Sequence, residues 1–139
     1  MKKLIFIFIV LLLPYLSTVS FAQTWNTANQ VTLAWDAVPQ DKPTDQPNKY
    51  QVYTKAGSPT ATPQKAGAET IARQQSVTFA TEGRYYLCVG AIRYPQGETI
   101  GIHSSRLACS DIAADTATGA FGVVYYVVPA APGGLKLAP

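Results

Sequence analysis

The 139-residue sequence is poor in the side chains that most enzymes use for catalysis. It has one histidine, two cysteines and eight carboxylates spread along the chain, and it lacks a GxSxG elbow, a CxxC pair and a regular Asp/Asn/Gly spacing. A serine hydrolase, a redox-active dithiol and a calcium loop therefore lack their usual signatures. His103 lies beside Ser104 and Ser105, but neighbours along a strand point to opposite faces of a sheet. We interpret His103 as a sheet-surface residue and expect no catalytic residue, no metal site and no cofactor.

Charge is also scarce. After Lys2 and Lys3 are set aside with the N-terminal segment, nine basic residues stand against eight acidic ones between Gln23 and Pro139, a net charge of +1. No cluster of Lys or Arg is available to follow a phosphate backbone or an anionic membrane surface. We therefore expect no nucleic-acid partner.

The apolar run at the N-terminus is short. It extends from Leu4 to Leu13 behind two lysines, and the small residues Ser20 and Ala22 stand at the minus-three and minus-one positions of a cleavage site. A membrane span needs roughly 20 apolar residues, whereas this run ends near Tyr15. The pattern is that of a secretory signal peptide, and no cysteine near its end indicates lipid attachment. We expect cleavage after Ala22, a secreted or periplasmic location, and no stable membrane insertion of the mature chain.

The remainder alternates apolar and polar residues in short segments, which is typical of antiparallel sheets. Strands are predicted near residues 31–36, 49–55, 70–72, 77–79, 85–91, 100–109 and 121–128. Seven segments in about 100 residues predict a single β-sandwich. The Pro-rich residues 37–48 and the Ala, Gly, Pro and Thr-rich residues 56–68 predict exposed loops. Residues 111–119 predict a flexible connector or one helical turn.

The two cysteines face each other in a predicted hairpin. Cys88 is out of phase with the inward series that starts at Tyr85, and a hairpin centred between Glu98 and Thr99 would place it opposite Cys109. Facing cysteines on neighbouring strands can oxidise outside the cytosol. We predict a structural disulfide between Cys88 and Cys109.

Aromatic residues are numerous. Those in phase with the apolar positions are expected in the core: Trp35, Tyr50, Phe79 and Tyr85. Those that alternate outward or sit at a loop are candidates for contact with a protein or a glycan: Tyr53, Tyr86 and Tyr94. Ordinary cross-strand pairs on a wet sheet face are an equally good interpretation of these three residues.

Three stretches resemble strands B, C, F and G of a fibronectin type III domain. They are VTLAWDAV from residue 31, KYQVYTKAG from residue 49 and GRYYLCVGAIRYPQGETIGIHSS from residue 83. Trp35 matches the core tryptophan of strand B. The inward series of strand F and the glycine and serine after it match Tyr85, Leu87, Val89, Ala91, Gly97 and Ser104 or Ser105. The resemblance covers roughly residues 29–110 and implies an all-β, antiparallel, immunoglobulin-like sandwich of three strands on four.

Both ends of the chain depart from that family. Only QTWNTAN separates Ala22 from the strand B match, so the first strand is expected to be missing, whereas residues 130–137 resemble such an opening strand. We divide the chain into a signal peptide at 1–22, a sandwich at 23–110 and a C-terminal extension at 111–139 that forms an additional β segment. In one hypothesis residues 121–128 return along the sheet and residues 130–137 supply the first strand, to this chain or to a neighbour. A disordered end is the alternative.

The resemblance also implies that two loops, Pro39–Asn48 and Tyr94–Gly101, lie at one end of the sandwich. On that basis Asp41, Asp45, Tyr94 and Gln96 are predicted contact residues. We expect a non-catalytic exported interaction module that binds a protein or a glycan. The alternatives are a structural subunit that self-assembles through its C-terminal strand and an accessory domain of a secreted carbohydrate-active system.

Overall fold

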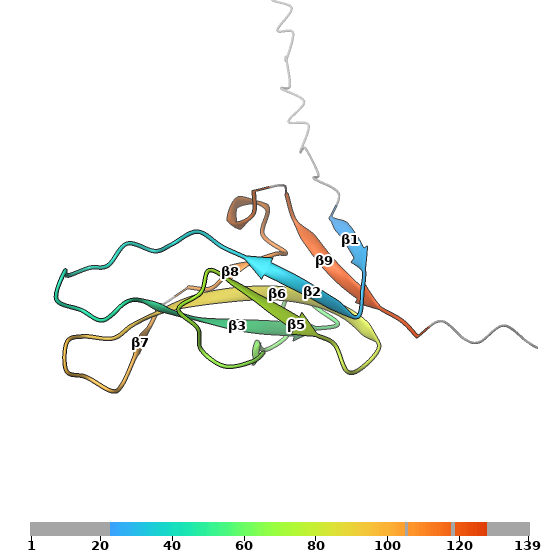
Figure 1. The fold of residues 1–139 in the computed structure, drawn as a ribbon. Helices are drawn as coiled ribbons and strands as arrows, with labels where there is room; N and C mark the ends of the chain where they lie inside the picture. The colour runs from blue at the N-terminus through green and yellow to red at the C-terminus, as the bar shows by residue number, and fades with distance from the viewer. Residues whose placement is uncertain (1–22, 105, 118, 128–139) are drawn as a thin grey trace, which may run out of the picture.

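A computed structural model describes residues 23–104, 106–117 and 119–127, and it shows a β-sandwich (Figure 1). The elements are β1 Thr24–Thr27, β2 Gln30–Ala34, β3 Lys49–Ala56, β4 Gln64–Lys65, β5 Gln74–Thr78, β6 Gly83–Arg93, β7 Ile102–His103, β8 Ala108–Cys109, the 3-10 helix η1 Ala113–Asp115, and β9 Phe121–Tyr125. The predicted all-β sandwich is confirmed.

The main sheet has the order β1-β9-β6-β3-β4, with β7 and β8 also paired with β6, and β2 and β5 form a second sheet. Figure 1 shows β2 and β5 lying across β3 and β6.

The long strand β6 organises the main sheet. One of its edges pairs with β3, and the other is shared in turn by β7, β8 and β9, all antiparallel to it. β9 therefore continues the path of β7 and β8. The hypothesis that residues 121–128 return along the sheet in the opposite direction was wrong, and the extension expected after residue 110 enters the main sheet. Residues 130–137 lie outside the described residues.

The cysteine pair is in the predicted register, although the turn is not. β7 pairs Ile92 with His103, which centres the hairpin between Gly97 and Glu98, one residue earlier than predicted. β8 nevertheless pairs Cys88 with Cys109, because the loop at residues 104–107 contains two more residues than the opposite stretch of β6. The disulfide is present.

The expected absence of a first strand was wrong. β1 pairs in parallel with β9, from Thr24 opposite Phe121 to Thr27 opposite Val124. Its anchor is Trp25, whose ring meets the ring of Tyr86 edge-on at 5.4 Å between centroids and lies 5.1 Å from the Arg84 guanidinium. Gly122 makes room for this ring, because a Cβ at that position would lie 2.5 Å from Trp25 Cζ3.

The core lies between the two sheets. Its fully enclosed side chains come from four strands and from the residue after β5: Val52, Val77, Phe79, Leu87 and Val123. Tyr85 and Trp35 pack against this cluster, which confirms the predicted inward phase. The Tyr85 ring stacks on Phe79 at 4.4 Å, and its hydroxyl donates to Thr81 O at 2.6 Å. Burying each large apolar side chain contributes about 1.5–3 kcal/mol.

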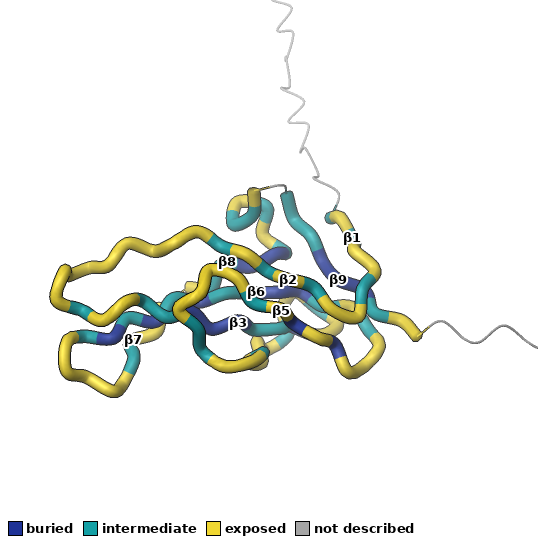
Figure 2. Tube along the Cα trace, in the orientation of Figure 1, coloured by how far each residue is buried: buried dark blue, intermediate teal, exposed yellow. Residues whose placement is uncertain are grey.

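The outer face of the main sheet is covered as well. Tyr86, Cys88 and Ile92 alternate away from the core, yet all three are buried, and Figure 2 shows β6 dark along much of its length. The prediction that Tyr86 and Tyr94 present exposed rings was wrong. Trp25 packs against Tyr86, and Glu69 and Lys49 contact Tyr94.

The second sheet has two strands, where the resemblance implied three. β2 pairs with β5, and within the described part of the chain no strand pairs with the other edge of β2. The reason is the position of β1, which joins β9 and not β2. This edge is called the open edge of β2 below.

Candidate functional site

A cleft of about 690 Å³ opens between the two sheets next to the open edge of β2. Its floor is the inner face of β6, one wall is the end of β2 with the residues that follow, and the other wall is β8 with the η1 segment. The apolar side chains that line these surfaces include Leu33, Trp35, Val38, Val89, Ala91 and Phe121. The cleft is therefore mainly apolar and is reached past a strand edge.

The hydrogen-bond pattern of β2 identifies the backbone groups at the open edge. Trp35 N–H donates to Arg73 O at 3.0 Å, and Asn29 O accepts from Phe79 N–H at 2.8 Å. Bonding alternates along an antiparallel strand, so the residues of β2 that bond to β5 alternate with Thr32 and Ala34. The N–H and C=O groups of Thr32 and Ala34 face the open edge. Such groups are a template for another extended chain.

Trp35 borders the cleft. Its ring is tilted against Tyr50 at 5.5 Å between centroids, and the Tyr50 hydroxyl accepts a hydrogen bond from Val38 N–H at 2.9 Å. Its indole Nε1 is buried and has no acceptor among the described residues. A buried indole N–H normally has a partner, so Trp35 carries a donor that the described residues leave unpaired at the border of the cleft.

Asp115 fixes the far wall. Its carboxylate accepts from Arg106 Nη2 at 2.5 Å and from Cys109 N–H at 3.0 Å, which joins η1 to β8. Burial acts to raise the pKa of Asp115, but the hydrogen bonds from Cys109 and Arg106 and the Arg106 charge outweigh it, and the pKa is lowered. Asp115 is therefore a charged, internally paired group.

The loop end of the molecule holds the contact residues predicted from the sequence. Asp45 accepts from Arg93 Nε at 2.5 Å with its side chain 3% exposed, whereas Asp41 lies 3.6 Å from the same nitrogen and is 72% exposed. The hydrogen bond from Arg93 is the main cause that lowers the pKa of Asp45, and the same bond raises the pKa of Arg93. Because a guanidinium already lies between the two carboxylates, they are poorly suited to hold a calcium ion.

Further bonds tie the two loops together. Gln46 donates from its backbone N–H to Tyr94 O and from Nε2 to Glu98 O, each at 3.0 Å. Tyr94 is 8% exposed, and its hydroxyl donates to Glu69 Oε2 at 2.6 Å, which raises the pKa of Tyr94. Gln96 is exposed. The structure thus brings Asp41 and Asp45 together around Arg93 and encloses Tyr94; a binding role for these residues and Gln96 stays a prediction.

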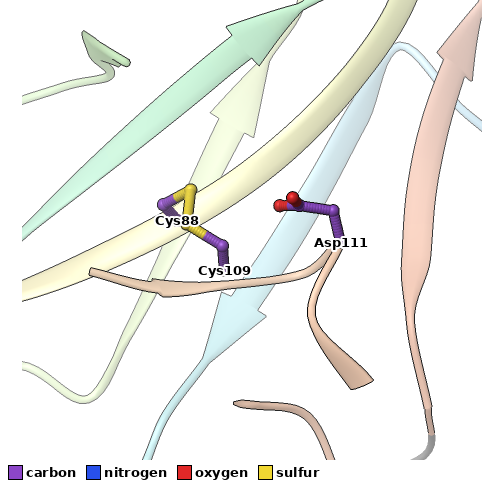
Figure 3. Close-up of side chains that lie close together, drawn as sticks. All are labelled: Cys88, Cys109 and Asp111. Carbon is purple, nitrogen blue, oxygen red and sulfur yellow. A yellow bond between two sulfur atoms is a disulfide. The ribbon is translucent and has the colours of Figure 1, made fainter. Parts of the chain in front are cut away.

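The disulfide forms a third cluster with Asp111. Figure 3 shows Cys88 on β6, Cys109 on β8, and the Asp111 carboxylate directed toward the sulfur atoms. Asp111 Oδ1 is paired with Lys55 Nζ at 2.9 Å, and Lys55 also donates to Pro59 O at 2.7 Å. Since the sulfurs are bonded to each other and the carboxylate has a cationic partner, the cluster is structural. Closing the loop between cysteines 21 residues apart stabilises the fold by about 3 kcal/mol.

His103 and Ser104 do not form a catalytic pair in the described residues. Both are exposed, and Ser104 Oγ donates to Arg106 O at 3.0 Å. Ser105 lies outside the described residues.

Comparison of the chain with family profiles, curated proteins and solved structures yields no match. No helix in residues 23–127, as far as they are described, has the length and apolar character needed to cross a membrane. The function therefore has to be inferred from the geometry of the cleft and the loop end.

Proposed function

We propose that this chain is an exported, non-catalytic interaction module that binds an extended segment of a protein partner in the cleft. The observation that carries the proposal is the open edge of β2 directly beside an apolar cleft. A segment hydrogen-bonded to Thr32 and Ala34 would direct alternate side chains into the cleft. In this mode the backbone bonds supply affinity and the pockets for side chains supply specificity.

The loop end is less favourable as the main site. Asp45 and Arg93 neutralise each other. Tyr94 is engaged within the protein, because its hydroxyl bonds to Glu69 and Lys49 lies over its ring. A glycan at the loops would need an exposed aromatic platform, whereas Tyr94, the one aromatic residue of the two loops, is 8% exposed. A protein partner in the cleft therefore fits the chain better than a glycan at the loops.

Export is supported by the disulfide, because such bonds persist in oxidising compartments. Cys88 and Cys109 are both buried, which suits a permanent cross-link in a secreted or periplasmic protein. The proposed signal peptide at residues 1–22 is a sequence feature outside the described residues.

The fibronectin type III-like character of the module is part of the proposal. The hydrogen bond from the Tyr85 hydroxyl to Thr81 O, near the start of β6, supports it. A tyrosine in this position that bonds back to the backbone is a hallmark of immunoglobulin-like sandwiches. The two strands of the second sheet depart from the family, and this departure creates the cleft.

The test is a selection of peptides on the mature chain, residues 23–139. We expect displayed random 12-residue peptides that bind it to alternate apolar and polar residues. Ala34→Pro removes an N–H from the open edge and leaves the bonds to β5 in place, so it should weaken selected peptides by about tenfold or more. Ala34→Ser, which keeps the N–H, is the matched control.

Asp41→Asn tests the competing loop site. Selected peptides that bind the Ala34→Pro variant normally but lose affinity for the Asp41→Asn variant would place the site at the loops and overturn the proposal. Failure to select any alternating peptide would also count against it.

A further inference from the structure

We infer that Gln23 is a modification site, carried in the exported protein as pyroglutamate, and that the fold favours this form over free glutamine. Pyroglutamate is the lactam that closes between the α-amine of a terminal glutamine and its own side-chain carboxamide. The inference rests on the export part of the proposed function, because it requires cleavage after Ala22. It does not depend on the cleft or on what binds there.

The reaction needs only a glutamine at a chain end. Cleavage after Ala22 would give Gln23 a free α-amine, which is unprotonated in part of the population near neutral pH. The amine nitrogen attacks Cδ of the same side chain, the bond from Cδ to Nε2 breaks, and an amine proton passes to Nε2, which leaves as ammonia. A five-membered ring results, and no oxidant, reductant or other co-reactant is consumed.

The attacking nitrogen lies outside the strand pairing. Gln23 directly precedes β1, and Thr24 N–H donates to Ala120 O at 3.0 Å, just before β9. Successive residues of an edge strand direct their backbone groups alternately toward the partner and away from it, so the Gln23 nitrogen points to the unpaired edge of β1. In the described part of the chain β1 pairs with β9 alone. The nitrogen can therefore react without breaking a bond of that ladder.

The carboxamide of Gln23 lacks a partner where it lies. Its Nε2 atom is buried and has no hydrogen-bond partner among the described residues. A Cβ on Gly122 would lie 2.9 Å from Gln23 Nε2 and 2.5 Å from Trp25 Cζ3, so the amide nitrogen lies over the glycine beside the indole ring. A buried polar group without a partner opposes folding.

Cyclisation removes the unsatisfied group. Nε2 is lost as ammonia, so its two N–H donors no longer have to be buried over Gly122 beside Trp25. The lactam keeps a single N–H, at the former amine nitrogen, which points to the unpaired edge of β1. The folded state therefore favours the lactam over the free glutamine.

A closed lactam would also protect β1. Trp25, which packs on Tyr86 at 5.4 Å between ring centroids, is the third residue of the chain after cleavage. Aminopeptidases need a free α-amine, and stepwise removal of three residues would take Trp25 away and uncover Tyr86. The modification thus blocks the shortest route to loss of this strand.

The experiment expresses the full 139-residue chain in a host that exports it and measures the intact mass of the exported protein. The expected mass is that of residues 23–139 with the disulfide, lighter by one ammonia. After unfolding, pyroglutamate aminopeptidase should remove one residue and leave a chain that begins at Thr24. Gln23→Asn is the matched control: it keeps a carboxamide but would have to close a four-membered ring, so it should lose no ammonia.

The preference of the fold has its own measurement. Residues 23–139 freshly released from an upstream tag carry free glutamine, and their thermal midpoint is compared with that of the exported form. The cyclised protein should melt at least about 3 °C higher, because it buries one unpaired amide fewer.

Three results would overturn the inference, and each has a different meaning. A free glutamine at residue 23 of the exported chain overturns it and leaves export standing. A terminus at another residue overturns it together with cleavage after Ala22. Equal midpoints of the free and cyclised forms overturn the preference of the fold for the lactam. Peptide binding in the cleft is tested separately by Ala34→Pro, so the proposed binding function can stand or fall independently of all three.

Discussion

At the scale of single residues, Trp35 lies at the boundary between the closed core and the open cleft. One side of its ring meets Tyr50, and the residue also lines the cleft. Its indole N–H is buried and lacks an acceptor among the described residues. Its removal would enlarge a space that is already open to water or to a bound segment. The energetic cost of removing it should therefore differ from that of a sealed core residue.

Trp35→Ala is expected to lower the free energy of unfolding by about 2–3 kcal/mol, less than the roughly 3–5 kcal/mol typical of a sealed tryptophan. Urea unfolding of residues 23–139 measures the change. Tyr126→Ala, at a side chain that is 55% exposed, serves as the control and should stay within about 0.5 kcal/mol. A loss below 1 kcal/mol or so for Trp35→Ala would show that the ring is not part of the core.

Period-two alternation predicted the inward residues correctly but not the state of the opposite face. Tyr85 and Leu87 point inward as expected, and Cys88 points the other way and meets Cys109. Alternation tells which side of a sheet a residue occupies, not whether that side is wet. Tyr86 is buried because Trp25 on β1, some 60 residues earlier in the chain, packs over it.

At the scale of elements, the loops at one end are held to each other by an ion pair between Asp45 and Arg93. The pKa of Asp45 lies below its ordinary value of 3.8, so between the two pKa values the folded protein binds fewer protons than the unfolded chain. Stability from this pair is therefore fully present well above pH 3.8 and is lost as the pH falls through the lower, folded pKa.

Asp45→Asn should remove this part of the acid dependence. Thermal midpoints recorded from about pH 6 to about pH 2.5 should fall more steeply for the parent than for the variant. Asp41→Asn should follow the parent curve, because Asp41 is largely exposed and more distant from Arg93. Parallel curves for the parent and Asp45→Asn would contradict the assigned role.

The edge of β6 shows what local patterns leave undecided. One strand was predicted over residues 100–109, and the structure has two short strands with an irregular loop between them. A Cβ at Gly90 would lie 2.7 Å from Leu107 Cδ2, so the loop packs over β6 where that residue lacks a side chain. Gly90 and Leu107 are 17 residues apart, so their contact cannot be predicted from the alternation of apolar and polar residues within either segment.

At the scale of the whole molecule, the cleft exists because the short strand β1 pairs with β9 and leaves one edge of β2 unpaired. A first strand could pair with β2 or with β9, and residues 24–27 carry no apolar alternation that favours either. Pairing with β9 is favoured because Gly122 leaves room for the Trp25 ring and Tyr86 packs against it. The sequence thus predicted the sandwich and its disulfide, whereas the cleft depends on tertiary contacts that only the assembled fold reveals.

The parallel pairing of β1 with β9 also determines how the molecule would respond to tension. The chain enters this ladder opposite Phe121 and leaves it beyond Tyr125, so pulling on the two chain ends would slide the strands past each other. All bonds of the ladder would then bear load together and not break one by one.

Asn26→Pro should lower the unfolding force measured by single-molecule pulling on the two ends. Thr24 N–H donates to Ala120 O, just before β9, and Ala28 N–H donates to Val124 O within it. Alternation directs the N–H of Asn26 the same way. Thr27→Pro, on the opposite phase, should have the smaller effect, and equal effects would contradict shear loading. The strand that pairs with β9, and so leaves the edge of β2 open, would thus also act as a mechanical clamp between the two ends of the described chain.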